Sequence, residues 1–328
     1  MDELVLGIEA SSTVCALLAD VDGTMLGVGR AAGANATAYP VEVVSERLAG
    51  AIISTLGATP ATRVAYAVVG MAGLNDASES AAHAALERVW QQTGLTCPVR
   101  VVSDPVAAFA AGTHERSGAV LIAGTGSIAA WISDETVVHR VDGHGWLVGD
   151  DGSGFWLGRQ AVRAVLAELD GRGEPTLLRM AVLGTLADSD ELPSDPTAQL
   201  TVLRGAVYDQ PPIALSRLAP LVPAAAEAGD RVAQRIVDRA VTLLVDTIDA
   251  LYADLKEHGD VTGAPVVLAG DMLTSPGRIQ REVLRRTAER YGRHPTVADN
   301  VAGGAAWLAL RSLHPDAPEA VHTRLRTP

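Results

Sequence analysis

Lysine is almost absent from this chain of 328 residues, and Lys256 is the single one. Nearly all other positive charge is carried by arginine. A P-loop requires a lysine in a Gly-Lys-Ser/Thr sequence, and a protein kinase requires one on an early strand. Neither of these common phosphate-binding classes therefore fits, and any ATP chemistry must use a different cradle.

Cysteine is also scarce, and long apolar runs are missing. The chain opens as MDELVLGIEASS, with two acids and without the basic flank and long apolar stretch of an export signal. No later run is long enough to span a bilayer. These absences predict a soluble, cytoplasmic protein with no membrane partner, in which Cys15 and Cys97 are reduced, packed thiols.

Positive charge is in deficit overall, because the formal net charge is −13 at pH 7. Such a chain has no general basic field for phosphate backbones, which argues against a dedicated nucleic-acid binder. The length exceeds the common single-domain range, so we expect two domains.

The apolar segments predict an α/β protein whose architecture is repeated. In the first part, we expect strands at 4–9, 14–20, 24–32, 64–70 and 99–103, and helices at 40–56 and 77–92. The turn Asp22-Gly23 marks a hairpin, and the later alternation of helix and strand predicts parallel additions to the sheet.

The second part begins again with consecutive strands between residues 119 and 143. A mainly helical stretch follows over about 152–260, with an apolar stripe from 231 to 256 that is typical of a buried helix face. We then expect a strand in APVVLAG, a helix after Ser275, a short strand near Thr296 and a last helix in GGAAWLALRSL.

Two strand-to-strand turns are candidate phosphate loops. Gly124-Thr125-Gly126 follows an apolar strand and can offer backbone N–H groups to an anion. The alternatives are an ordinary tight turn or a dinucleotide fingerprint, but the next segment favours a strand, and the helix that the fingerprint needs is missing. The first hairpin places Ser12 and Thr13 in a similar turn, which could instead be merely solvated.

Carboxylates near strand ends and in a glycine-rich loop are candidate catalytic and substrate groups. Asp104 follows the strand VRVVS and precedes Pro105, so it could be the N-cap of a helix, a base for a hydroxyl that attacks phosphate, or both. Residues 143–158 form a loop rich in Gly, Asp and Trp, in which Asp150 and Asp151 could bind sugar hydroxyls; alternatively one of them, or Ser153, could cap the next helix. Gly270, and the small residues of VAGGAAWLAL, suit either an adenine contact or tight packing.

In order and spacing, these motifs resemble those of the N-acetylglucosamine kinases and their BadF/BadG/BcrA/BcrD-type ATPase relatives. This family belongs to the sugar kinase, heat-shock protein 70 and actin superfamily. The resemblance spans almost the whole chain. It rests on GIEASST, GANAT, GMAGLND, VSDPVAAFAAG, IAGTGS, GWLVGDDGSGFWLG, VVLAGDMLTS and VAGGAAWLAL. It implies a two-lobed actin-like ATPase fold, made of duplicated ribonuclease H-like domains around a central cleft. The N-terminal lobe would comprise residues 1–103 and 299–328. The C-terminal lobe would comprise residues 104–298 and contain a helical insertion.

The resemblance also implies the reaction, which is ATP-dependent phosphorylation of an amino sugar. The first candidate is the conversion of N-acetylglucosamine to its 6-phosphate. ATP and Mg²⁺ would be the cofactors, and a homodimer is expected. Asp104 would be the catalytic base and would bind the sugar together with Asn35, Gly145 and Asp150. Glu9 would act on Mg²⁺ through water. The implied nucleotide-binding residues are Ser12, Thr13, Gly124, Thr125, Gly126, Gly270 and Asp271.

The chain departs from the family pattern in its first hairpin, which reads Glu9-Ala10-Ser11-Ser12-Thr13 where relatives commonly read Asp-Gly-Gly-Gly-Thr. Glu9 keeps the carboxylate, but fewer glycines limit how closely backbone approaches phosphate. His144 and Trp146 also stand where the family more often has Trp and His.

Two other functions are open to a chain with these motifs. One is an ATPase that activates a reductase or dehydratase, although such proteins hold an iron–sulfur cluster on paired cysteines and Cys15 and Cys97 make no convincing site. The other is a non-catalytic sugar or nucleotide sensor, which the altered first hairpin would favour.

Overall fold

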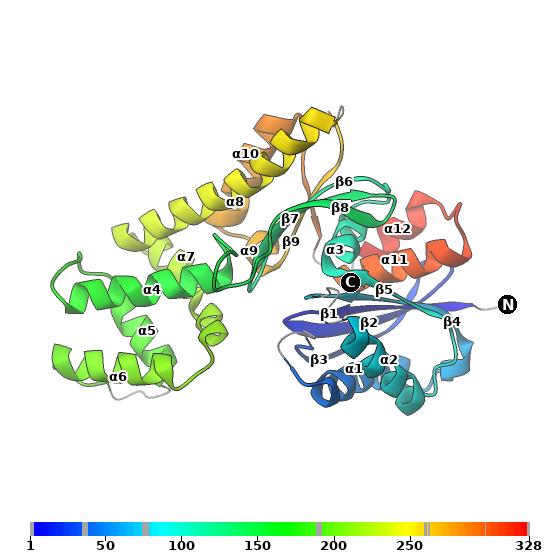
Figure 1. Ribbon diagram of the computed structural model, residues 1–328, viewed down its shortest axis with the longest axis horizontal. Coiled ribbons are helices and arrows are strands. Elements are labelled where there is room, and N and C mark those ends of the chain that lie inside the picture. The colour runs from blue at the N-terminus through cyan, green and yellow to red at the C-terminus, as the bar shows by residue number, and fades with distance from the viewer. Residues whose placement is uncertain are drawn as a thin grey trace.

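The structure is a computed structural model that describes residues 3–34, 39–73, 79–187, 192–258, 261, 263–298 and 300–326. Two five-stranded mixed sheets form its framework (Figure 1). The first has the order β3-β2-β1-β4-β5 and the second β10-β9-β6-β7-β8. In each, three antiparallel strands are extended by two parallel ones. This repetition confirms the predicted α/β class and the repeated architecture.

The strands lie close to their predicted positions. The first sheet consists of β1 (Leu4–Ala10), β2 (Thr13–Asp20), β3 (Met25–Ala32), β4 (Val64–Met71) and β5 (Val99–Ser103). The second consists of β6 (Gly118–Ala123), β7 (Ser127–Ser133), β8 (Thr136–Asp142), β9 (Val266–Ala269) and β10 (Thr296–Ala298). The Asp22-Gly23 turn is confirmed, because Gly23 N–H donates to the Asp20 carbonyl at 3.0 Å.

Side-chain alternation along β1 explains how helices cover the first sheet. Leu4, Leu6 and Ile8 pack on one face with α1 (Val41–Leu56) and α2 (Glu79–Thr93). Val5 packs on the other face, among residues of α3 (Asp104–Gly112), α11 (Val301–Leu313) and α12 (Glu319–Arg326). Figure 1 shows these last three helices between the two sheets.

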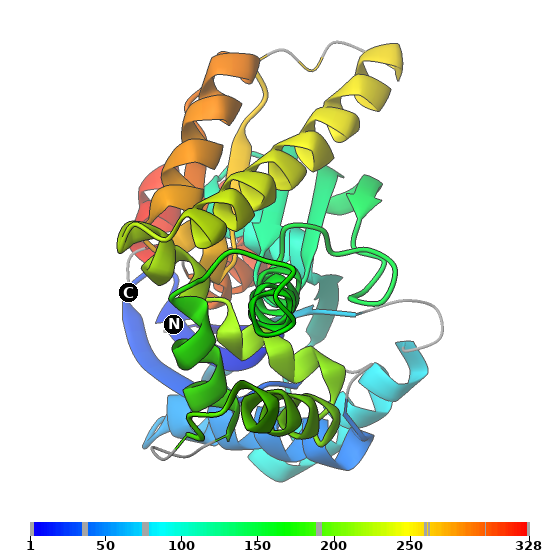
Figure 2. The ribbon, with the colours of Figure 1, turned by 90° about the vertical axis from the view of Figure 1, so that its left-hand side faces the viewer.

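The second sheet buries its other face under a helical region (Figures 1 and 2). The helices are α4 (Gly154–Leu169), α5 (Leu178–Ala187), α6 (Pro196–Tyr208), α7 (Leu221–Glu227), α8 (Arg231–His258) and α10 (Arg278–Tyr291). The short helical segments are η1 (Ala61–Arg63), η2 (Pro212–Leu218) and α9 (Asp271–Thr274). The helix predicted after Ser275 is α10, and the short α9 between β9 and α10 is an addition to the predicted elements.

The apolar stripe of α8 is largely the predicted core. Val237, Val241 and Leu244 are fully or almost fully buried. Val232 and Ile236, near the start of the helix, are only half-buried. No helix in the described part of the chain is both long and apolar enough to cross a membrane.

Small residues allow α11 to pack closely on β1 and α3. A Cβ on Gly7 would lie 2.2 Å from the Ala302 carbonyl oxygen, and one on Gly304 would lie 2.4 Å from that of Ala107. VAGGAAWLAL therefore serves a tight helix crossing, which is one of the two interpretations made from the sequence.

Candidate active site

Two carboxylates that follow strands, those of Asp104 and Asp271, lie within electrostatic range of a third, that of Glu9. Glu9 is near the end of β1, Asp104 directly follows β5, and Asp271 follows β9 after one glycine. The charges of Asp104 and Asp271 both act to raise the pKa of Glu9. Because β1 and β5 belong to the first sheet and β9 to the second, this acidic group is assembled from both sheets.

Glu9 is held in a poorly solvated position. Burial first, and then the neighbouring acids, raise the pKa of Glu9 to about 7. The Ser11 hydroxyl donates to Glu9 Oε1 at 2.9 Å, which lowers that pKa in part. A nearby cation would favour the ionised form of this carboxylate.

Asp104 is the first residue of α3, and its side chain caps nothing. Ser103 occupies the N-cap position and Pro105 follows in the first turn, so the reading of Asp104 as the N-cap is wrong. Burial raises the pKa of Asp104 to about 6. No hydrogen bond to its carboxylate occurs within the described residues, so the oxygens are free to accept a proton from a ligand.

The Gly124-Thr125-Gly126 turn joins β6 and β7 as a hairpin, as predicted. Gly124 N–H donates to the Gly126 carbonyl at 2.9 Å, whereas the N–H groups of Thr125 and Gly126 have no acceptor in the described chain. The first N–H groups of α4 donate to this turn, from Gly154 to Gly124 O at 2.8 Å and from Phe155 to Thr125 O at 3.1 Å. The start of α4 thus fixes the turn, and two of the turn's N–H groups are left without an acceptor among the described residues.

Gly270 packs directly against this turn. It has a φ of +85°, and a Cβ there would lie 2.5 Å from the Ala123 carbonyl oxygen and 2.9 Å from Gly124 N. Only glycine combines that backbone conformation with such close contact. The structure therefore brings the predicted nucleotide residues Gly124 and Gly270 together.

The first hairpin presents Ser12 and Thr13 as exposed side chains without hydrogen bonds to described residues. Its turn is closed by Ser11 N–H, which donates to the Thr13 carbonyl at 2.9 Å, and by Ala34 N–H, which donates to Ser11 O at 3.1 Å. A Cβ on Gly33 would lie 2.4 Å from Ser12 O, so the chain crosses closely behind the turn.

Asp150 is buried, with 8% of its surface exposed, and it lies against the Gly124–Gly126 turn. A Cβ on Gly126 would lie 2.7 Å from Asp150 Oδ2. Burial and the charge of Asp142 raise the pKa of Asp150, while the backbone amides of Ser127 and Gly145 lower it in part. The predicted sugar residues Asp150 and Gly145 are thus close together, whereas Asn35 lies outside the described residues.

Asp142 is a positioning residue that the sequence did not reveal. Its Oδ1 accepts from Asp150 N–H at 2.8 Å and its Oδ2 from Asp151 N–H at 3.0 Å. Its position at the end of β8, before Gly143, was the available signal. The helix that follows this loop is capped by Ser153, whose Oγ accepts from Trp156 N–H at 3.2 Å, so Asp150 is not the cap.

The described residues contain no group of three His, Cys, Asp or Glu side chains arranged to hold a metal ion. Mg²⁺ is commonly bound through only one or two carboxylates together with substrate phosphates. A single carboxylate such as Glu9, beside the turn of the first hairpin, fits that mode. Cys15 and Cys97 are both buried and unpaired, which confirms them as packed thiols.

Comparison with known proteins gives consistent relatives. The model of the BadF/BadG/BcrA/BcrD ATPase family matches residues 6–309. An N-acetylmuramic acid/N-acetylglucosamine kinase from Clostridium acetobutylicum is 32% identical over 171 residues, which is 52% of this chain and 54% of that protein. An N-acetyl-D-glucosamine kinase from Dictyostelium discoideum is 29% identical over 231 residues, 68% of this chain and 69% of that protein. The matches thus span about half and about two thirds of these relatives.

Solved structures share the architecture. A candidate N-acetylglucosamine kinase from Chromobacterium violaceum superposes with a TM-score of 0.70 at 21% identity, over 94% of this chain and 99% of that one. A ROK family glucokinase from Streptomyces griseus, in complex with glucose and AMPPNP, superposes with a TM-score of 0.54 at 20% identity, over 93% and 99%. These likenesses confirm the predicted two-lobed, actin-like fold.

Proposed function

Because the chain belongs to the BadF/BadG/BcrA/BcrD ATPase family, we propose that it is an ATP-dependent kinase of an amino sugar, with N-acetylglucosamine as the first candidate. The proposal is supported by the similarity to the N-acetylglucosamine kinases of Clostridium acetobutylicum and Dictyostelium discoideum. The observation that carries it is Asp104, a desolvated carboxylate without a hydrogen-bond partner among the described residues, in the same acidic group as Glu9 and Asp271.

In the proposed reaction, Asp104 accepts the proton of the sugar 6-hydroxyl as that oxygen attacks the γ-phosphorus of ATP. The new O–P bond forms while the bond to the β,γ-bridging oxygen breaks, and ADP leaves with that electron pair. A pKa of about 6 leaves Asp104 mostly ionised at pH 7 and more basic than an exposed aspartate. In a loose phosphoryl-transfer transition state, most of the catalysis comes from positioning and charge stabilisation.

The two hairpin turns would hold the phosphates from opposite lobes. We assign Thr125 and Gly126 to this role through their N–H groups, which have no acceptor among the described residues, with Gly124 completing the turn. Ser12 and Thr13 would contribute exposed hydroxyls from the first hairpin. Gly270 and Asp271, which adjoin the Gly124 turn, would lie at the adenosine end.

Mg²⁺ would be held with the nucleotide by Glu9, through a water molecule. When bound, the ion neutralises phosphate charge and orients the γ-phosphate. Its positive charge would also draw Glu9 into the ionised form, which burial and neighbouring acids disfavour in the free protein.

The sugar would bind at the loop after β8, through Asp150 and Gly145, together with Asn35. Asp150 is fixed by its own backbone bond to Asp142 and by contact with Gly126, so a hydroxyl bound there would be linked to the phosphate turn. A homodimer and a cytoplasmic location stay predictions from the sequence.

The decisive experiment is ADP release by the purified protein with Mg-ATP, compared across N-acetylglucosamine, glucosamine, N-acetylmuramic acid, glucose and no sugar. We expect release that depends on an amino sugar, and a phosphorus NMR signal coupled to the protons on C6 of the product. Release without sugar would favour an activator ATPase instead. Calorimetric sugar binding without any turnover would favour a sensor.

A further inference from the structure

Arg30 of β3 lies in the same cross-strand row as Glu9 of the acidic group. In the first sheet, Glu9 is paired with Cys15 of β2, and Cys15 is paired with Arg30. Side chains of directly opposed residues point to the same face of a sheet. Thr13 lies two residues before Cys15, so its side chain points to that face as well. The register thus places Arg30, Glu9 and the candidate phosphate residue Thr13 on one face.

This face of the first sheet is the one that points toward the second sheet. Cys15 belongs to the apolar core that also contains Val120 of β6 and Ala130 of β7. These two strands are joined by the Gly124–Gly126 turn. Arg30 therefore lies on the side of its sheet from which the proposed nucleotide site is built.

The guanidinium of Arg30 lies near Glu9 and has no partner in the described chain. Burial and the neighbouring acids raise the pKa of Glu9, and the charge of Arg30 partly offsets them. The same charge acts on Cys15, where burial has the larger effect and raises the pKa of the thiol. Arg30 is exposed and has no hydrogen bond or ion pair with a described residue. Its N–H groups can therefore bind a ligand beside Glu9.

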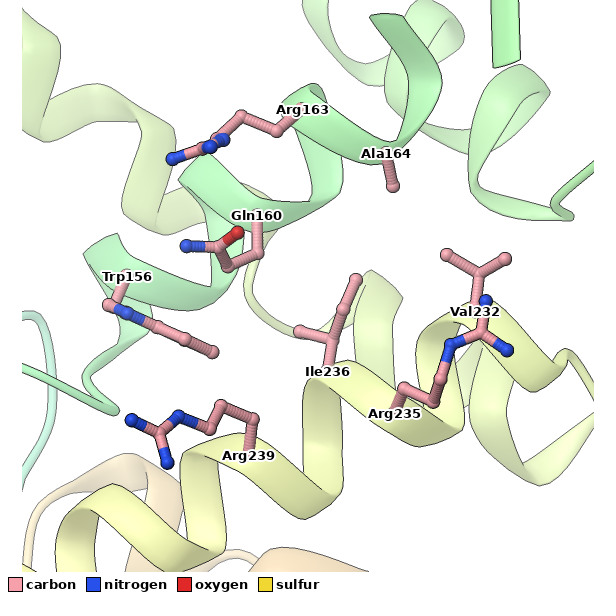
Figure 3. Close-up of a pocket in the computed structure, with 8 residues that line it drawn as sticks. All are labelled: Trp156, Gln160, Arg163, Ala164, Val232, Arg235, Ile236 and Arg239. Atoms are coloured by element: carbon pink, nitrogen blue, oxygen red, sulfur yellow. The ribbon is translucent and has the colours of Figure 1, made fainter. Parts of the chain in front are cut away.

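Other exposed arginines do not share this placement. Figure 3 shows Arg163 and Arg239 at the groove between α4 and α8, apart from each other and with Trp156 and Gln160 between them. Neither belongs to the sheet that carries Glu9. The backbone of Arg30, in contrast, is held two strand spacings from that of Glu9, which is about 10 Å.

The candidate site calls for a cation at this position. The carboxylates of Glu9, Asp104 and Asp271 oppose the binding of a triphosphate. Ser11, which stands in place of a glycine, cannot donate to phosphate, because its N–H donates to the Thr13 carbonyl and its hydroxyl to Glu9. A guanidinium can supply the missing donors, since it binds phosphate oxygens through paired hydrogen bonds.

The strand order indicates which phosphate Arg30 would contact. β3 and β5 are the opposite edges of the first sheet, and β1 lies in the middle. Asp104, the proposed base, follows β5, so Arg30 lies across Glu9 from it. In an in-line transfer, the attacking and leaving oxygens lie on opposite sides of the γ-phosphorus. A cation on the far side from the base is therefore placed for the β-phosphate, which belongs to the leaving group.

We propose that Arg30 binds the β-phosphate of the nucleotide and stabilises the leaving ADP. This inference rests on the nucleotide site of the proposed function. When the bond from the γ-phosphorus to the β,γ-bridging oxygen breaks, the electron pair stays on that oxygen and negative charge grows on the β-phosphate. Arg30 keeps its proton throughout, and its hydrogen bonds to the β-phosphate oxygens strengthen as this charge develops.

The test measures nucleotide affinity of the full protein by isothermal titration calorimetry, without sugar. In R30Q, the dissociation constant of Mg-ADP should rise at least about tenfold, because a charge-assisted contact is lost. That of AMP, which has no β-phosphate, should stay within about twofold. R30K keeps the charge without the planar fork and should lie between R30Q and the wild type. In sugar-dependent ADP release, kcat of R30Q should fall at least about tenfold.

The matched control is R204Q, which removes the same charge from an exposed arginine of α6 without a partner among the described residues. It should leave every one of these values within about twofold, since charges outside contact range are screened by salt. Titration of ADP in EDTA separates a direct contact from an effect through Glu9 and Mg²⁺, because the loss in R30Q should persist without metal. The proposal is overturned if R30Q binds Mg-ADP as the wild type does, if AMP binding weakens equally, or if the loss disappears in EDTA.

These outcomes distinguish a failure of this inference from a failure of the proposed function. If the wild type releases no ADP with any sugar but R30Q still loses affinity for ADP and not for AMP, the kinase function fails and the phosphate contact stands. If the wild type is a sugar kinase and R30Q binds Mg-ADP unchanged, the phosphate contact alone fails. A wild-type protein that does not bind Mg-ADP would overturn both.

Discussion

Asp104 brings together two properties that stability alone does not favour, a desolvated carboxylate and the lack of a hydrogen-bond partner in the described chain. Its raised pKa means that the folded protein holds the neutral form better than the unfolded chain does. Ionised Asp104 therefore destabilises the fold increasingly as the pH rises from 3.8 to about 6, and constantly above that.

The variant Asp104→Asn should separate function from stability. We expect kcat to fall by a factor of about 10² to 10⁴, because the amide cannot accept the hydroxyl proton. The free energy of unfolding at pH 8 should rise by about 1 to 2 kcal/mol, since the buried charge is removed. Steady-state kinetics and urea unfolding measure the two effects. The control Asp316→Asn, at an exposed aspartate, should change neither; an active Asp104→Asn enzyme would exclude Asp104 as the base.

The pH dependence of the wild-type reaction follows from the same residue. Below a pKa of about 6, Asp104 is protonated and cannot act as a base, so kcat/KM should fall about tenfold per pH unit on the acid side. The plateau should lie above pH 7. Initial rates between pH 4.5 and 8.5, with stability checked at each pH, measure this profile. A constant kcat/KM down to pH 5 would contradict the assignment.

At the residue scale, sequence reasoning located groups that carry a local signature. Asp104 stands between an apolar strand and a proline, and Gly270 stands at the end of another strand. Asp142 was missed because it acts on the backbone of Asp150 and Asp151, eight and nine residues later. Contacts of that kind depend on loop geometry, which residue types alone do not specify.

At the element scale, the crossing of α3 and α11 positions Asp104, because that residue begins α3. Gly304 on α11 lies against α3, where a Cβ would be 2.4 Å from Ala107 O and 2.5 Å from Ala111 N. Both contacts are to backbone, so neither can move without moving the helix.

Replacement Gly304→Ala should therefore destabilise the protein and lower activity together. We expect a loss of about 1 to 3 kcal/mol from overpacking, and a reduced kcat as α3 shifts. Chemical unfolding and sugar-dependent ADP release report the two changes. Gly50→Ala in α1 is the control, because nothing lies within 4 Å of that position. It should stabilise by about 0.5 to 1 kcal/mol; equal effects of both substitutions would refute the tight crossing.

The last helix, α12, is fixed by a buried histidine. His322 is 2% exposed, and its Nε2–H donates to the Ala110 carbonyl of α3 at 2.8 Å. Its ring also meets Trp307 edge-on, with centroids 5.2 Å apart. Burial lowers the pKa of His322 to about 4, so the folded protein keeps it neutral.

This depressed pKa predicts acid sensitivity. Unfolded chains protonate the histidine below pH 6.5, whereas the fold does so only near pH 4. Stability from this residue is therefore complete above pH 6.5 and is lost as the pH falls to 4, by about 3 kcal/mol in total. His322→Gln keeps a hydrogen-bond donor for the Ala110 carbonyl. It should remove this loss of stability between pH 6.5 and pH 4, as measured by thermal unfolding at a series of pH values. The exposed control His294→Gln should retain it; an unchanged slope in His322→Gln would contradict the assignment.

Elements were predictable where side-chain periodicity was clear. In β1, Leu4 and Leu6 face one core and Val5 the other, so both faces are buried and the apolar run is continuous. The short α9 was missed because its four residues span barely one helical turn, which is too short for a periodic pattern.

At the scale of the whole molecule, the repeated sheet order could be predicted because each half begins with three consecutive apolar strands. We propose that the chain is divided into the two lobes expected from the sequence. One lobe comprises residues 1–103 and 299–328, and the other comprises residues 104–298. Helix α3 contacts strands of both sheets, so the two lobes share packing around it. Pairings between distant residues across the lobes could not be predicted, since no local pattern encodes them.

One such pairing gathers around Glu135, in the turn between β7 and β8. Its carboxylate binds Arg100 of β5 and Arg311 of α11, and Arg116 lies 3.8 Å away. The side chains of Glu135 and Arg311 are only 11% and 6% exposed. This network joins the second sheet to elements packed on the first, and we expect it to fix the position of one lobe against the other.

Replacement Glu135→Gln should therefore destabilise the whole molecule, because it leaves the buried Arg311 guanidinium without its counter-ion. We expect a loss of about 3 kcal/mol in the free energy of unfolding, measured by urea denaturation. The adjacent variant Asp134→Asn is a matched control. Asp134 also has a positive φ and pairs with Arg116, but its side chain is 78% exposed, so its loss should cost less than about 0.5 kcal/mol.

Hydrogen exchange should distinguish a local effect from a change between the lobes. In Glu135→Gln, amides of β5 and of the β7–β8 turn should exchange faster together, because Arg100 and the turn lose the same partner. In Asp134→Asn, faster exchange should be confined to the turn. If Glu135→Gln loosens the turn alone and leaves β5 protected, the network does not connect the lobes, and the shared packing around α3 is what holds them together.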